Sequence, residues 1–322
     1  MNYTEARALI DRAIDKAAQV GAGGAFAVVG SDGALISASK MDHDEAGGMA
    51  RARSKAWISA TQQVPSTVHH NRMRTLPPPI ATGFVANSPE ASFPGAGGMT
   101  LTDGNGRIVA GFSASGSSIG PFVDLPGVER RYLIAQGKPA NSEDLIVQWA
   151  LGLDYVGQHG DDAKRWMEAF GELPDEEGLG YTDPPSAEQP RHRWAVELVD
   201  LVFVEAKRRG VRVAVTVCDR GGDPIQQDAM EGSATAGSIV AEAVARSAAR
   251  FELPSSSVRA DLAALLPTAA SVAPGGLPIR GNEAVGGLGI GPASSGDAVF
   301  AAIGIGGPDP DLCHEIAAAV LG

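Results

Sequence analysis

The feature that most constrains the fold of this chain is an internal repeat at a constant offset of 189 residues. The offset holds without a gap over some sixty residues, and a later glycine motif repeats at the shorter offset of 178. The matching segments are Ala6–Asp11 with Ala195–Asp200, Gly33 with Gly222, Val64–Ser66 with Leu253–Ser255, and Gly97–Met99 with Gly275–Leu277. The period is too long for a solenoid repeat. The chain is therefore predicted to be a tandem duplication of one domain.

Each copy is predicted to contain the same order of elements. Apolar residues at helical spacing predict a helix over residues 6–17, and a strand–turn–strand hairpin follows around Ser31–Gly33. A second helix is expected over 46–62, before a passage rich in proline and glycine. The later expected elements are strands at 99–102, 107–113, 284–290 and 299–305 and a last helix over 310–321. This pattern predicts an α+β fold, in which each duplicated domain is an antiparallel sheet with helices packed against it.

The domain boundaries follow from the repeat and from the charge. We expect a first domain over residues 1–141, an acidic, partly helical connector over 142–190, and a second domain over 191–322. Most of the net charge of −12 lies in the connector, where twelve acidic residues face only Lys164 and Arg165. We expect its apolar residues Leu145, Trp149, Trp166 and Phe170 to pack, with 174–190 exposed. Because no basic stripe is present, nucleic acid is excluded as a partner.

Composition and motifs exclude several other classes of protein. Hydrophobic residues make up 44 % of the 322, yet no run is long enough to cross a membrane and no signal peptide is evident, so a cytoplasmic protein is expected. The two cysteines form no disulfide framework, and no histidine or cysteine spacing predicts a metal site. The glycine clusters lack the sequence or the context of a nucleotide-binding loop.

Several short motifs then occur in a specific order: Lys40–Asp42, Lys55–Ala56 on the second helix, Val64–Ser66, Gly275–Ile279, and Gly304–Gly307 before the last helix. In this order and spacing the chain resembles the GlcG/HbpS-like proteins over about residues 4–116 and 192–321. That family includes a haem-binding protein and the C-terminal domain of a cobalamin adenosyltransferase.

The resemblance implies a small α+β domain that assembles into dimers and larger oligomers. We therefore expect a homo-oligomer of pseudo-dimeric chains, with the two copies paired about an approximate twofold axis. It also makes haem a candidate cofactor. The chain departs from the family pattern, however, because the helix lysine of the first copy is replaced by Val244 in the second. No haem ligand can therefore be assigned by position.

The strongest candidate site is a stripe on the second helix of the first copy. Arg51, Lys55 and Ser59 are spaced at i, i+4 and i+8 and so share one face. The same positions of the second copy hold apolar residues, namely Val240, Val244 and Ala248. One interpretation is a solvent-exposed face in one copy and a packed face in the other. The second is that Arg51, Lys55 and Ser59 line a pocket for a carboxylated ligand, with Lys55 as a candidate catalytic group.

Three further groups of residues are candidates. Asp42 either caps the following helix or, with Glu231 at the equivalent place, handles a ligand or a proton, and His43 is a candidate acid–base group or haem ligand. Adjacent side chains point apart, so only one of His69 and His70 can reach a ligand, and His70 is taken as the candidate. Backbone N–H groups at paired glycines can bind an anion; these glycines are Gly97, Gly98, Gly275 and Gly276.

Two functions remain open. The first is a small-molecule-binding protein that holds haem or another carboxylated ligand, an anion, in a pocket of the first copy. The second is a cofactor-independent lyase, isomerase or hydrolase that acts on a small organic acid in catabolism. In that case Lys55 and Arg51 bind the anion, and Asp42 or His43 moves a proton.

Overall fold

The computed structural model describes residues 1–19, 23–42, 44, 46–88, 92–93, 95–116, 134–135, 138–139, 142–153, 192–264, 270–280 and 299–322. These residues form two compact units. The first contains the described residues of 3–34 and 44–153, and the second contains 35–42 and those from 192 onward. Both units combine an antiparallel sheet with packed helices, which confirms the α+β class.

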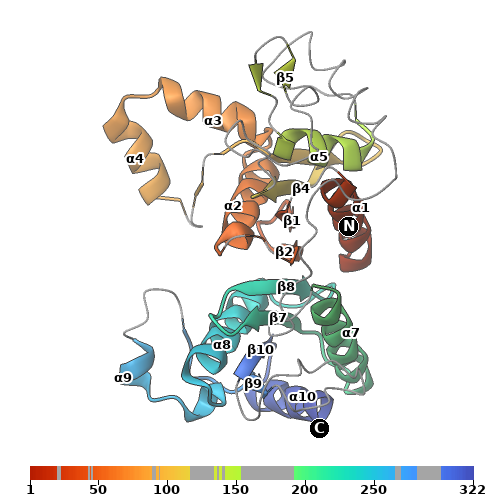
Figure 1. Cartoon of the computed structure of the whole chain (residues 1–322), viewed down its shortest axis with the longest axis vertical. Coiled ribbons are helices and arrows are strands. Elements are labelled where there is room, and N and C mark those ends of the chain that lie inside the picture. Colours follow the sequence, from red (N-terminus) through yellow and green to blue (C-terminus); the bar gives the residue numbers. More distant parts are fainter. Residues whose placement is uncertain are drawn as a thin grey trace. The chain divides into compact units, whose positions relative to one another are not determined.

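The first unit is built on the strand order β3-β4-β1. Helix α2 packs on β4, β1 and β3, while α1 and α5 contact each other and cover the other face of the sheet (Figure 1). Its elements are α1 Tyr3–Gln19, β1 Ala25–Gly30, α2 Gly48–Thr61, α3 Ser66–Thr75, α4 Pro78–Ala86, β3 Gly98–Thr102, β4 Ile108–Ser115, the short pair β5 Ile134–Ala135 and β6 Lys138–Pro139, and α5 Ser142–Leu151.

The second unit has the strand order β2-β8-β7-β10-β9. Helix α8 packs on β10, β7 and β9, and α10 packs on α7. Strand β2 belongs to this unit, where it pairs with β8 in the register Ala38↔Gln227. The elements are β2 Leu35–Lys40, α7 His192–Arg208, β7 Ala214–Asp219, β8 Pro224–Ala229, α8 Gly237–Phe251, a 3-10 turn Ser255–Ser257, α9 Ala260–Ala263, β9 Gly276–Arg280, β10 Val299–Gly306 and α10 Pro310–Leu321.

A shared hydrogen bond explains why one serine motif occurs twice. The Gly98 N–H donates to Ser66 Oγ over 2.8 Å, and the Gly276 N–H donates to Ser255 Oγ over 3.0 Å. The preceding glycines, Gly97 and Gly275, have φ of +105° and +117°, a conformation that favours glycine. The same contact therefore anchors β3 in one unit and β9 in the other. This supports the duplication predicted from the repeat.

Helix α5, expected as part of the connector, packs on the first unit. Leu145 and Ile146 are fully buried, and Lys16 of α1 places its ammonium 4.7 Å from the centre of the Trp149 ring. Arg12 Nε donates to the Ala150 carbonyl, so a cation satisfies an acceptor at the helix C-terminus. Trp166, Phe170 and the 174–190 segment lie outside the described residues.

The passage rich in proline and glycine contains a helix that the sequence did not predict. Helix α4 has Pro78 at its first position, where a missing N–H costs no hydrogen bond. The expected strand at 284–290 lies outside the described residues. Within the described ranges, no helix is long and apolar enough to cross a membrane.

Candidate functional site

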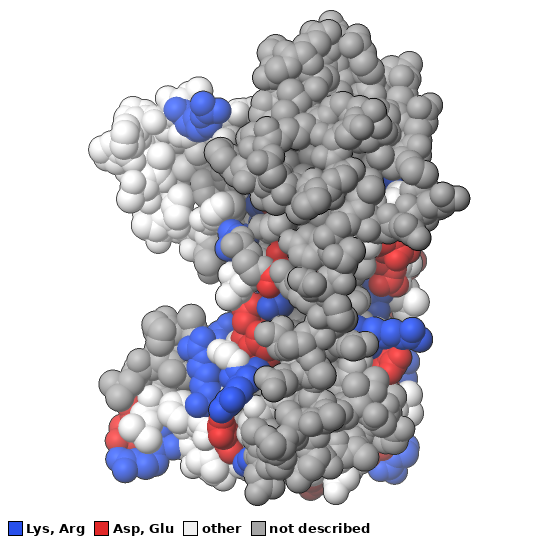
Figure 2. Space-filling model, in the orientation of Figure 1, with Lys and Arg blue, Asp and Glu red and all other residues white. Residues whose placement is uncertain are grey.

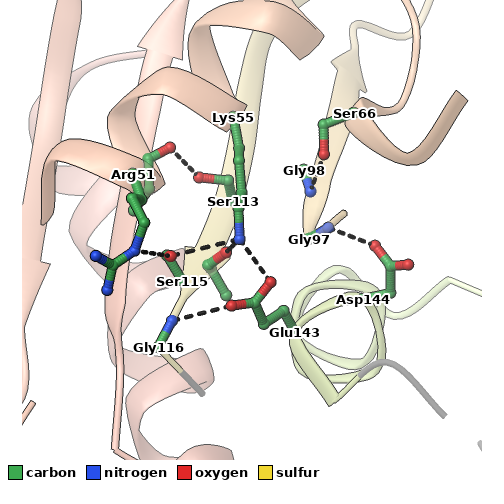
Figure 3. Close-up of polar contacts among 12 residues, drawn as sticks. Arg51, Lys55, Ser66, Gly97, Gly98, Ser113, Ser115, Gly116, Glu143 and Asp144 are labelled. Atoms are coloured by element: carbon green, nitrogen blue, oxygen red, sulfur yellow. Dashed lines mark hydrogen bonds and ion pairs between the residues drawn. The ribbon is translucent and has the colours of Figure 1, made fainter. Parts of the chain in front are cut away.

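Lys55 lies inside the first unit, against the sheet. Gly111 of β4 allows close packing of α2, because a Cβ at this position would lie 2.2 Å from the Ala56 carbonyl oxygen. Lys55 is 2 % exposed, and its Nζ donates to Glu143 Oε2 at 2.5 Å, to the Ala114 carbonyl at 3.1 Å and to Ser115 Oγ at 3.4 Å (Figure 3). The cationic stripe is therefore not a solvated helix face at Lys55.

Glu143 and Asp144, in the first turn of α5, were not predicted as site residues. Glu143 Oε1 accepts the Gly116 N–H at 2.9 Å while its other oxygen holds Lys55. Asp144 Oδ1 accepts the Gly97 N–H at 2.7 Å, and the Thr67 hydroxyl donates to the same carboxylate. Two acidic residues at a helix start are a favourable pattern in themselves. The sequence analysis counted both residues among the twelve acidic residues of the connector and so did not single them out.

The environment of Asp144 changes its proton affinity. Burial raises the pKa of Asp144 from 3.8 to about 6, because desolvation disfavours the charged carboxylate. The bonds from Thr67 and Gly97 act in the opposite direction without cancelling the effect of burial, and the nearby Glu143 adds to the rise. This carboxyl group therefore titrates near neutral pH.

A cavity of about 380 Å³ opens beside the Lys55–Glu143 ion pair. Arg51 also lines it and donates from Nε to Ser115 Oγ over 3.4 Å (Figure 3). The Lys55 ammonium lies 5.6 Å from the centre of the Phe93 ring. The other lining residues are small, namely Gly95, Ala96 and Gly116. Two of the three residues predicted to line a pocket, Arg51 and Lys55, therefore line this cavity.

Ser59 and the glycine pairs are not in this cavity. Ser59 is fully buried, and its hydroxyl has no hydrogen-bond partner in the described part of the chain. The N–H groups of Gly97 and Gly98 bind Asp144 and Ser66. In the second unit Gly276 likewise binds Ser255, and the Gly275 carbonyl accepts the Ile305 N–H. An anion therefore finds three of the four expected donors already used.

The remaining candidates lie elsewhere. Asp42 belongs to the second unit, where its Oδ1 accepts the N–H of His192 at the start of α7, so it caps a helix other than the expected one. Glu231 is exposed in the turn after β8. His70 is half-buried on α3 and lines neither described cavity. His43 lies outside the described residues.

The corresponding place in the second unit is apolar. Glu143 stands beside Gly97, and Cys313 of α10 stands beside Gly275 in the same way. Val244 replaces Lys55 on the helix, and the strand position of Ser115 is taken by Gly306, which packs against the Gly237 carbonyl. Burial raises the pKa of the Cys313 thiol to about 11, so it stays protonated at neutral pH. Among the residues that the structure describes, the charged groups at this place therefore belong to the first unit.

Fold and site together define a duplicated α+β protein with a polar cavity in its first copy. The family described as haem degrading protein HbpS-like matches residues 1–119 and 192–321, so the chain belongs to this family and carries it in tandem. No curated protein matches the chain. Among described residues no cluster of histidine, cysteine or carboxylate side chains is placed to hold a metal ion.

Several solved structures are similar to part of the chain. A double mutant of HbpS from Streptomyces reticuli is 24 % identical, with a TM-score of 0.33, over 42 % of this chain and 88 % of that one. The ORFY protein of Klebsiella pneumoniae is 18 % identical, with a TM-score of 0.35, over 41 % and 88 %. A complex of PduOC with haem is 16 % identical, with a TM-score of 0.32, over 39 % and 88 %.

Proposed function

We propose that this protein binds a small organic molecule with one carboxylate group in the cavity of its first unit. The observation that carries the proposal is the grouping of Arg51 with the buried Lys55–Glu143 pair around one concavity. At the equivalent place in the second unit, the described residues Val244 and Cys313 stand where the first unit has Lys55 and Glu143. We infer that the first copy holds the ligand and the second serves as scaffold.

The charge of the cavity lining selects the ligand class. Arg51 and Lys55 contribute two positive charges and Glu143 one negative charge, which leaves a net charge of +1. Lys55 already donates to three acceptors, the full number of its ammonium protons. Arg51 lines the same cavity, and its planar guanidinium, with five N–H donors, is the group that we assign to a ligand carboxylate, which a guanidinium can bind through two N–H groups.

The uncharged part of the lining favours a compact ligand body. Phe93 offers an aromatic face, and Gly95, Ala96 and Gly116 let a ligand approach the backbone closely. A volume of about 380 Å³ lies at the lower end of the range for small-molecule sites. We infer a ligand of metabolite size.

Haem fits this cavity poorly. Haem iron is held by histidine, cysteine, methionine or tyrosine, and the described lining of the cavity contains none of these residues. Its propionates would have Arg51 as a partner, but its iron would have no axial ligand from the described lining. We therefore favour a smaller carboxylated ligand over haem for this site.

Calorimetric titration with a panel of small monocarboxylates, each paired with its uncharged amide, tests the proposal. The carboxylates should bind and the amides should bind at least tenfold more weakly. Arg51→Gln should weaken carboxylate binding by about tenfold to a hundredfold, the effect of losing a charge-assisted hydrogen bond. Arg53→Gln, on the same helix but outside the cavity lining, is the matched control. Equal binding by the Arg51 and Arg53 variants would contradict the proposal. A Soret band after haem addition would favour haem instead.

The Lys55–Glu143 pair also supports the catalytic alternative. A carboxylate next to an ammonium group in a cavity is an arrangement suited to moving a proton at a bound acid. In this interpretation Glu143, not Asp42, is the proton-transfer group, because Asp42 does not line the cavity. Deuterium exchange at the α-carbon of bound carboxylates in D₂O, followed by NMR, should occur. It should be lost in Glu143→Gln under conditions in which circular dichroism shows that this less stable variant is still folded. Binding without exchange would limit the protein to a binding role.

A further inference from the structure

A second cavity of the first unit lies at the end of α2, between α3 and α4, and has a volume of about 530 Å³. Its walls are largely apolar and include Trp57, Met73, Ile80 and Phe84. Its described lining contains no lysine, arginine, aspartate or glutamate. This cavity therefore differs in character from the charged one beside Lys55.

One polar side chain of this lining, Ser88, has a buried hydroxyl oxygen without a hydrogen-bond partner among the described residues. His69, which also lines the cavity, is only 3 % exposed. Burial lowers the pKa of His69, and Arg72 and His70 lower it further. The neutral imidazole then offers one donor and one acceptor.

Unsatisfied polar groups in an apolar enclosure are costly unless a ligand meets them. Helix α4 also leaves apolar side chains in contact with water, which is unfavourable. None of its residues is buried, and Ile80 and Phe84 are about half exposed. The surface over α3 and α4, at the upper left of Figure 2, is mostly uncharged. A ligand in the cavity would cover apolar surface and satisfy Ser88 at once.

The second copy has different residues at the positions of this cavity lining. At the repeat offset of 189, Trp57 and His69 correspond to Arg246 and Val258. Helix α4 also lies in the stretch where the first copy is longer, since the offset falls to 178 after it. The combination of Trp57, His69 and α4 is therefore a feature of the first copy.

We propose that this cavity is a second ligand site, for an uncharged aromatic molecule that carries a hydroxyl or carbonyl group. The rings of Trp57 and Phe84 and the side chain of Met73 face the flat body, and His69 or Ser88 bonds the polar group. The described part of the lining carries no charged side chain, which favours an uncharged ligand over an ion. The volume lies within the usual range for small-molecule sites. The site does not depend on the carboxylate site.

The test uses 2-naphthol as the probe, titrated into the full chain and followed by calorimetry. Gly83 lines the cavity, and a Cβ added there would meet no atom within 4 Å. Gly83→Leu should therefore fill the cavity and weaken 2-naphthol binding at least tenfold. Its Tm should not fall, because glycine in a helix interior is itself destabilising. Gly83→Ala gives the same gain in helix propensity with little filling and should keep binding.

Two further measurements separate the chemistry of the site from its shape. Naphthalene-2-sulfonate, a charged analogue, should bind at least tenfold more weakly than 2-naphthol. His69→Phe should remove most of the preference for 2-naphthol over naphthalene while naphthalene still binds. Failure of 2-naphthol to bind the unmodified chain, or equal binding by Gly83→Leu, would overturn the proposal. A third outcome would also overturn the proposal. If 2-naphthol does not bind and Gly83→Leu changes the sedimentation coefficient of the protein, the α4 surface is a contact between two copies of the chain and not a ligand site.

Discussion

Lys55 and Glu143, which are 88 residues apart in the sequence, form a 2.5 Å ion pair in the first unit. The lysine comes from α2 on one face of the sheet, and the glutamate comes from the first turn of α5. Both side chains are largely buried, at 2 % and 13 % exposure. The pair therefore behaves as one electrostatic unit, and its members should not be interpreted separately.

Removal of one member of this pair should destabilise the first unit. Lys55→Met leaves the Glu143 carboxylate without its cation, and Glu143→Gln leaves the ammonium without its anion. Breaking a buried pair in this way costs about 3–5 kcal/mol. Urea denaturation should show this loss for each single variant. The double variant should lose clearly less than the two single losses combined. Strict additivity would show that the pair is not coupled.

The second copy offers the converse experiment. Val244 occupies the position of Lys55 and is fully buried. Val244→Lys places an ammonium in an apolar environment with Cys313 in the place of Glu143, so a loss of several kcal/mol is expected. The exposed neighbour Val240 is the control, because Val240→Lys should cost less than about 0.5 kcal/mol. A harmless Val244→Lys would show that this region of the second unit admits water.

Asp144 should make the stability of the first unit depend on pH. Its pKa is raised from 3.8 to about 6, so the folded state binds the proton more tightly than the unfolded state. This contribution is complete below about pH 4 and is lost as the pH rises through 6, at a total of at most about 3 kcal/mol. Asp144→Asn keeps the acceptor for Gly97 and Thr67 and removes the charge.

We therefore expect Asp144→Asn to gain stability relative to the unmodified chain between pH 4.5 and 7.5. Chemical denaturation at several pH values measures this difference. A constant difference across the range would mean that Asp144 does not titrate there. Asp103, which is half-buried and has a pKa lowered by Arg107, provides the control through Asp103→Asn.

The serines that anchor β3 and β9 should each contribute to stability. Ser66→Ala and Ser255→Ala each leave a buried glycine N–H without its acceptor, which costs about 1–3 kcal/mol. Thermal denaturation should show a loss for both variants, and at least as large a loss for Ser255→Ala, because the Ser255 hydroxyl also donates to the Ala273 carbonyl at 2.6 Å. A large loss of stability for one variant and none for the other would indicate that the serine–glycine hydrogen bond does not stabilise both copies.

The sequence predicted the duplicated elements because the repeat constrains them twice. Helices α1 and α2 and strands β3, β4 and β10 lie within a few residues of their expected bounds. The sequence also pointed to Arg51 and Lys55, which line the cavity. They stood out because the second copy has valine at both equivalent positions, Val240 and Val244. Glu143 was missed, since a partner brought in by α5 leaves no spacing signal. The sequence analysis did not predict α4. It interpreted the prolines before and within this helix as a loop, whereas proline is also favourable at the first position of a helix.

Helix α5 links ligand chemistry to local unfolding. Its first turn supplies Glu143 to Lys55 and Gly116, and Asp144 to Thr67 and Gly97. A ligand that displaces Glu143 from Lys55 must therefore release part of what fastens the helix to the sheet. Its measured binding free energy would then be less favourable than the intrinsic one by the free energy needed to open α5. Amide hydrogen exchange of residues 142–151 measures that opening free energy.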